Sequence, residues 1–128
     1  MRQVIVISDL HLGGVYPEPP RLGCRGFRLC TQAEAIARFI ARLADDVSSG
    51  ALIELVLNGD SVDFLAERDG VGETWSAFTA DPQQAVDKFE AIVERDKAVF
   101  DALGAFLETG GRVTLLLGNH DIELSFPA

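Results

Sequence analysis

The sequence predicts a single α/β domain with a parallel sheet, built in the order strand, helix, strand, helix, strand. Three short apolar runs rich in β-branched residues predict the strands, and stretches with apolar residues at helical spacing separate them. Each apolar run ends in a polar cluster, in the sequences "SDLH", "NGDSVD" and "GNHD". A chain of 128 residues is long enough for one hydrophobic core.

The first predicted strand covers residues 3–8, and the glycines, prolines and arginines of residues 12–30 predict a long loop after it. Residues 31–34 (TQAE) have the form of a capping box, so we expect a helix to begin there. Its apolar stripe consists of four residues at helical spacing: Ile36, Phe39, Ile40 and Leu43. Residues 48–50 (SSG) end this helix, and residues 52–57 form the second buried strand.

Residues 64–80 are expected to form a loop, after which Asp81 precedes Pro82 as an N-cap precedes a proline in the first turn. One long helix, or two helices with a break, should follow. Its apolar face is assigned to six residues: Val86, Phe89, Val93, Phe100, Leu103 and Leu107. Two glycines at 110–111 end the helix, and residues 112–117 form the third buried strand.

Composition excludes several classes of protein. Hydrophobic residues make up 48% of the chain, which is typical of a globular domain. No apolar run reaches the roughly 20 residues of a membrane span, and no signal peptide is visible, so a cytoplasmic protein is expected. The net charge of −9 argues against binding to a polyanion such as duplex DNA.

The polar clusters indicate a metal site. In an open parallel sheet, ligands bind beyond the carboxyl ends of the strands, where all three clusters fall. Five side chains are therefore expected to converge on one crevice: Asp9, His11, Asp60, Asn119 and His120. Oxygen and imidazole ligands suit manganese, iron or zinc, and a carboxylate such as Asp60 can bridge two metal ions.

The motifs D-x-H in "SDLHLGG", G-D-x-x-D in "GDSVD" and G-N-H-D in "GNHD" span residues 9 to 121. In type, order and strand-end position, the chain resembles the calcineurin-like metallophosphoesterases. The resemblance implies a βαβαβ core that forms the N-terminal half of a four-layer αββα sandwich. Residues 1–128 would then be an incomplete metallophosphoesterase domain, because the family's later ligands, including a G-H-x-H motif, are absent from a chain with two histidines.

The resemblance also implies two divalent metal ions, in the first place Mn²⁺, with iron or zinc as alternatives. Asp9 and His11 would bind the first ion, and Asn119 would bind the second. Asp60 would bridge the two ions.

For catalysis, the resemblance implies that His120 is not a ligand but faces the scissile phosphate, where it protonates the leaving oxygen. Asp63 would hold its imidazole. The nucleophile would be a metal-bridging water or hydroxide that attacks a phosphomonoester or phosphodiester in line. Phe64 and Leu65 stand where the protein Ser/Thr phosphatases of the family have Arg-Gly, so a protein substrate is less expected.

Three arginines in the first loop are candidates to bind the substrate phosphate: Arg21, Arg25 and Arg28. A solvated basic face explains them equally well. Asp121 is expected to be the N-cap of a short final helix. Asp63 could instead be a surface acid near a turn, without a catalytic role. Asp9 and Asp60 could cap helices or turns instead of binding a metal ion.

A non-catalytic scaffold of the same fold is the alternative function, and a nuclease acting on DNA is disfavoured by the charge. A sheet edge left uncovered would favour homo-oligomer formation.

Overall fold

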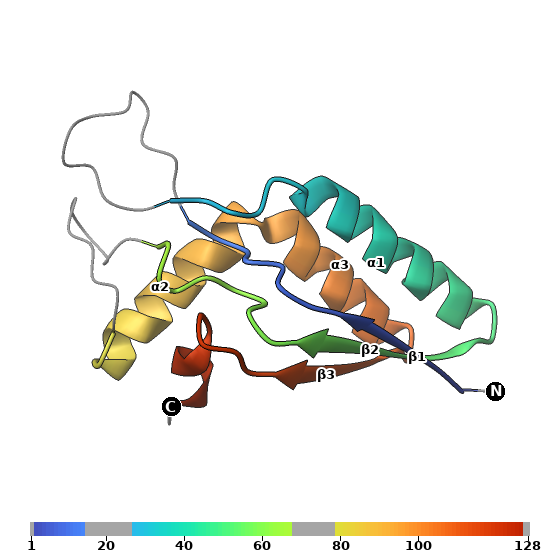
Figure 1. Ribbon diagram of the computed structural model, residues 1–128. Coiled ribbons are helices and arrows are strands. Elements are labelled where there is room, and N and C mark those ends of the chain that lie inside the picture. The colour runs from blue at the N-terminus through green and yellow to red at the C-terminus, as the bar shows by residue number, and fades with distance from the viewer. Residues whose placement is uncertain (1, 15–26, 68–78, 127–128) are drawn as a thin grey trace.

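The computed structural model describes residues 2–14, 27–67 and 79–126. It confirms an α/β fold with three parallel strands in one sheet (Figure 1). The elements are β1 (Arg2–Ile7), α1 (Ala33–Ser48), β2 (Leu52–Asn58), α2 (Pro82–Arg95), α3 (Lys97–Glu108), β3 (Arg112–Leu116) and the 3₁₀ helix η1 (Ile122–Ser125). The predicted strand positions are thus correct to within one residue at each end.

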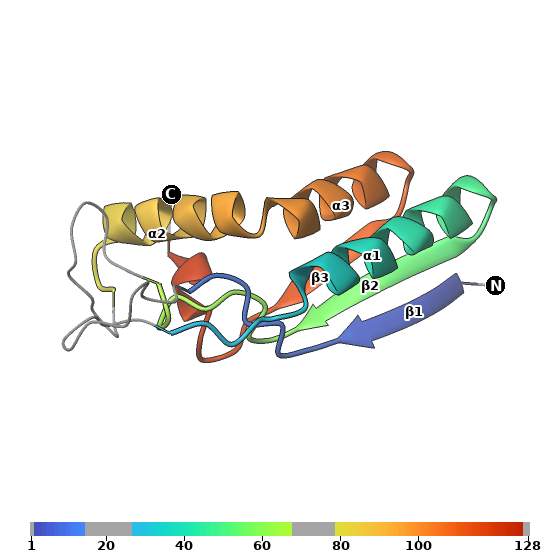
Figure 2. The ribbon, with the colours of Figure 1, turned by 90° about the horizontal axis from the view of Figure 1, so that it is seen from above.

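The strand order β1-β2-β3 explains how the layers are arranged. Both crossovers step in the same direction across the sheet, and right-handed crossovers then place their helices on the same face. Figure 2 shows α1 and α3 side by side over that face. The carboxyl ends of the strands are in register, with Ile7 opposite Leu57 and Asn58 opposite Leu116. All three loops that follow therefore begin at one edge.

The core lies between this face and the helices. In β2, Ile53, Leu55 and Leu57 are buried and alternate with more exposed residues. In the helical segment after residue 81, the predicted apolar face is correct in part. Phe89, Phe100 and Leu103 pack against the core, whereas Val86 and Leu107 are exposed. The most buried apolar positions are seven residues apart, each one residue before a predicted position: Ala85, Ile92, Val99 and Phe106. Four adjacent apolar pairs made both faces plausible, and packing selected the first member of each pair.

The other face of the sheet is open in the part of the chain that the structure describes. Val4 and Val6 are 57% and 58% exposed, and Leu52 and Leu116 are exposed as well. The strands are therefore buried on the face that α1 and α3 cover and exposed on the other, because both crossovers lie on one side. On the open face, the hydrogen bond from the Thr114 hydroxyl, and then Arg2, lower the pKa of Glu54.

Helix ends follow the predictions in part. Asp81 accepts a hydrogen bond from the Gln83 N–H at 2.8 Å, as expected of an N-cap before Pro82. The capping box at 31–34 does not form, because α1 begins one residue later with Gln32 as N-cap and no side-chain capping bond. The long helix is broken at Asp96, which resolves the alternative in favour of two helices. Among the described residues, no helix combines the length and apolar character needed to cross a bilayer.

Candidate metal and catalytic site

The three loops at the carboxyl ends of the strands are joined to one another by backbone hydrogen bonds. The His11 N–H donates to the Asp60 carbonyl at 2.9 Å, which joins the first loop to the second. The Phe64 N–H donates to the His120 carbonyl at 3.0 Å, which joins the second loop to the third. The predicted convergence of the three motifs is therefore observed in the backbone itself.

Three residues in these loops have a left-handed backbone conformation. Asp9, His11 and Asp60 have φ values of 56°, 48° and 50°, and they are the non-glycine residues with positive φ among those described. Such a conformation is uncommon for side chains other than glycine, costs about 1–3 kcal/mol, and clusters at functional sites. Here it turns three potential ligands toward one another.

One ligand atom from each of Asp9, His11 and Asp60 lies within 4.8 Å of the others. Neither the Asp9 nor the Asp60 carboxylate forms an ion pair with a basic side chain of the described residues. A bound cation would therefore neutralise their negative charge. Two carboxylates and an imidazole fit a divalent ion such as Mn²⁺, Fe²⁺ or Zn²⁺.

Gly118 provides the space that Asp60 needs. A Cβ atom at position 118 would collide with Asp60 Oδ1 and lie 2.7 Å from its Cγ and backbone nitrogen. The His120 N–H donates to the same Oδ1 at 2.9 Å and fixes the carboxylate. Asn119 lies between these two residues with its side chain exposed, so its predicted role as ligand of a second ion remains a prediction.

Asp63 connects two imidazoles. Its side chain is fully buried, with Oδ1 at 3.0 Å from His120 Nδ1 and Oδ2 at 3.0 Å from His11 Nδ1. The two rings are nearly perpendicular, with centroids 4.7 Å apart. The predicted contact between Asp63 and His120 is thus present and the surface-acid alternative is wrong. The contact with His11 was not foreseen, because the motif spacing does not reveal it.

The two contacts use the same nitrogen of each ring. With Nδ1 held by the buried carboxylate, each imidazole has Nε2 left to meet an ion or a substrate, and no described residue bonds to that atom. A carboxylate behind a ligating histidine fixes its tautomer and ring orientation. For His11 this geometry fits a metal ligand, and for His120 it fits a proton donor.

Asp121 differs from its predicted role. It occupies the N-cap position of η1 but makes no side-chain capping bond there. Its carboxylate is fully buried and accepts hydrogen bonds from the Ser61 N–H at 2.7 Å and the Gly118 N–H at 2.6 Å. Asp121 therefore ties the third loop to the second, at Ser61, the residue that follows Asp60.

A buried ion pair supports the first loop. Asp96, at the break between α2 and α3, accepts a hydrogen bond from the Gly13 N–H at 2.6 Å. Arg28 binds both oxygens of Asp96, at 2.5 and 3.2 Å, and donates to the Gly13 carbonyl. Arg28 thus has a structural contact that the sequence did not indicate, whereas Arg21 and Arg25 lie outside the described residues.

A second buried acid, Glu67, binds the backbone of Gly14, the next residue of the same loop. Glu67 accepts a hydrogen bond from the Gly14 N–H at 3.1 Å and pairs with Arg95 at 3.1 Å. Glu67 and Asp96 were both missed by the sequence analysis. For Asp96 the available signal was an acid inside a long helical pattern, which is weak without knowledge of the tertiary contacts; for Glu67 the sequence offers no such signal.

Comparison of the chain with protein-family models, curated proteins and solved structures gave no match.

Proposed function

We propose that this chain carries the divalent-metal site and the acid–base pair of a phosphoesterase that hydrolyses a phosphomonoester or a phosphodiester. The proposal assigns it to the calcineurin-like metallophosphoesterases. The observation that carries the proposal is the shared left-handed conformation of Asp9, His11 and Asp60, whose ligand atoms lie within 4.8 Å of one another. Capping of helices or turns gives no reason for three such residues to converge.

In this proposal Asp9, His11 and Asp60 hold one divalent ion, and Asp60 with Asn119 holds a second. Mn²⁺ is the preferred ion because most of these ligands are oxygen atoms. When bound, the ions would supply positive charge near the phosphoryl oxygens and acidify the attacking water.

His120 acts on the leaving group. Asp63 holds its Nδ1, so the opposite nitrogen Nε2 is the one available to the substrate. The proton on that nitrogen passes to the leaving oxygen as the P–O bond breaks. Because the Asp63 side chain is fully buried, water does not compete for its contact with the ring.

The exposed apolar residues on the outer face of the sheet support the predicted four-layer sandwich. In a four-layer sandwich a second sheet would pack on Val4, Val6 and Leu116. Two sheets packed in this way lie about 10 Å apart, with their apolar faces inward.

The test is hydrolysis of p-nitrophenyl phosphate and bis(p-nitrophenyl) phosphate with added Mn²⁺, together with the metal content of each variant. His120→Ala should lower kcat by about 10²–10⁴-fold while the metal content stays normal. Asp60→Asn should lose metal and activity together. Equal metal loss in both variants would contradict the role of His120, and a metal-loaded but inactive wild-type protein would favour the non-catalytic scaffold.

A further inference from the structure

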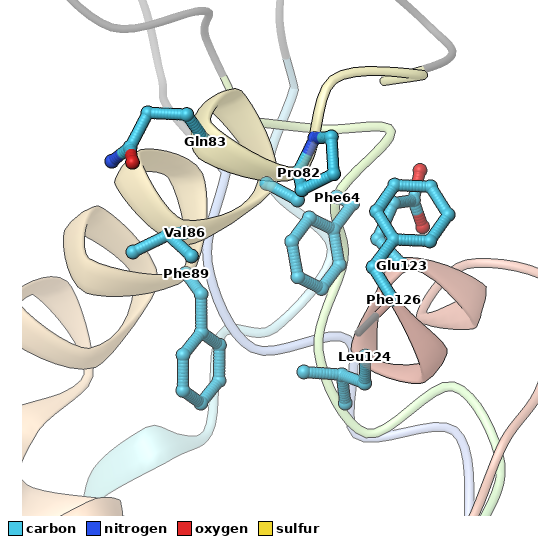
Figure 3. A pocket seen from close by; sticks show the side chains of 9 residues that line it. Phe64, Pro82, Gln83, Val86, Phe89, Glu123, Leu124 and Phe126 are labelled. Carbon is cyan, nitrogen blue, oxygen red and sulfur yellow. The ribbon is translucent and has the colours of Figure 1, made fainter. Parts of the chain in front are cut away.

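An apolar pocket of about 280 Å³ lies between α2 and η1 (Figure 3). Figure 3 shows Phe64 between the side chains of α2 and those of the segment at η1. Six of the lining residues carry the inference: Phe64, Val86, Phe89, Glu123, Leu124 and Phe126. An apolar cavity of about 150 Å³ in another protein binds benzene, so this volume accommodates a single ring with a substituent.

The pocket is connected to the proposed catalytic pair through Phe64, although neither Asp63 nor His120 lines it. Phe64 directly follows Asp63, and its N–H donates to the His120 carbonyl at 3.0 Å. Its ring stacks on Phe89 with centroids 6.4 Å apart. On the other side, the Leu124 N–H donates to the Asp121 carbonyl at 3.2 Å. A group in this pocket is therefore held by residues continuous with the loop that carries His120.

One polar atom in the lining has no partner. Glu123 is 6% exposed, and its Oε2 is buried without a hydrogen bond from any described residue. A buried carboxylate oxygen without a donor is costly, and a ligand that brings a charged donor recovers that cost. An ammonium group satisfies this oxygen and its charge at once.

We propose that this pocket binds the organic group of the phosphoester, and that this group is a single apolar ring bearing a protonated amine that pairs with Glu123. The aromatic wall receives the ring, and Glu123 selects the amine over a neutral or anionic substituent. The inference rests on the proposed function for the identity of the ester. The amine site itself can be tested without turnover.

The binding test uses benzylamine as the probe and benzoate as its anionic counterpart, both titrated by calorimetry. The wild-type protein should bind benzylamine and not benzoate. Glu123→Gln, which keeps the side-chain shape, should weaken benzylamine binding by about tenfold or more, which corresponds to loss of a hydrogen bond to a charged group. Val86→Trp should block binding by filling the pocket from a half-exposed position. The control Glu90→Gln, on the exposed side of α2, should bind as the wild type does.

If benzylamine does not bind, or binds equally to the wild type and both pocket variants, the proposed amine site in this pocket is wrong. The substrate assignment is tested by comparing 4-(aminomethyl)phenyl phosphate with phenyl phosphate. The wild type should prefer the amine by about tenfold in kcat/KM, and Glu123→Gln should remove this preference. Hydrolysis of both esters without such a preference would overturn the assignment. Binding of benzylamine without hydrolysis of either ester would instead overturn the proposed function and leave the amine site standing.

Discussion

At the scale of single residues, burial separates acids that look alike in the sequence. Asp9 is exposed and Asp60 is half-buried at the proposed metal site, whereas Asp63 and Asp121 are fully buried and hold neighbouring groups. The motifs were sufficient to predict that Asp9 and Asp60 lie close together and that Asp63 contacts His120. The position of Asp121 depends on hydrogen bonds with two backbone N–H groups from different loops, which no local pattern indicates.

Asp121→Asn should destabilise the protein although it removes no contact with a ligand. The amide oxygen can replace one of the two short hydrogen bonds, but the –NH₂ group would face the N–H of either Ser61 or Gly118. We expect a loss of about 3 kcal/mol in the free energy of unfolding, measured by urea denaturation. Asp45→Asn, on the exposed side of α1, is the control and should change little. Equal stability of the two variants would show that Asp121 is not a structural tie.

At the scale of elements, the break between α2 and α3 has a physical cause in the first loop. Asp96 sits at the break, where its carboxylate meets the Gly13 N–H and Arg28. Ile92, one turn earlier, contacts the same glycine so closely that a Cβ at position 13 would lie 2.6 Å from its Cγ1. Sequence periodicity could not choose between one helix and two, because the groups that bind Asp96 at the break lie 83 and 68 residues away in the chain.

Asp96→Asn should therefore affect both stability and the metal site. Loss of charge from Asp96, the buried member of this part-buried pair, should cost about 3 kcal/mol of the free energy of unfolding. Because Gly13 follows the His11 loop, Mn²⁺ affinity should also fall, by about tenfold.

Asp101→Asn is the matched control. Asp101 lies on the next helix and pairs with Lys97 in solvent, where hydrogen bonding by Asp101 raises the pKa of Lys97. This substitution should leave both the stability and the Mn²⁺ affinity unchanged within error. A loss of Mn²⁺ affinity in both variants, measured by calorimetry, would rule out a specific positioning role for Asp96.

At the scale of the whole molecule, two crossovers of the same hand place α1 and α3 on the same face of the sheet. The strands were predictable to within a residue because their apolar runs are bounded by glycine and polar residues. Which face of each strand is buried was not predictable. Val4 and Ile5 have similar side chains, and only the side chosen by the crossovers decides which of them is more exposed.

The proposed function requires that the three strand ends together form a divalent-metal site. The most direct measurement is a calorimetric titration of the chain with Mn²⁺, compared with Asp60→Asn. The asparagine can still accept the hydrogen bond from the His120 N–H, so the loop should keep its shape while the ligand charge is lost. We expect saturable Mn²⁺ binding that weakens by more than about 100-fold in the variant. Absence of binding, or binding unaffected by Asp60→Asn, would contradict it.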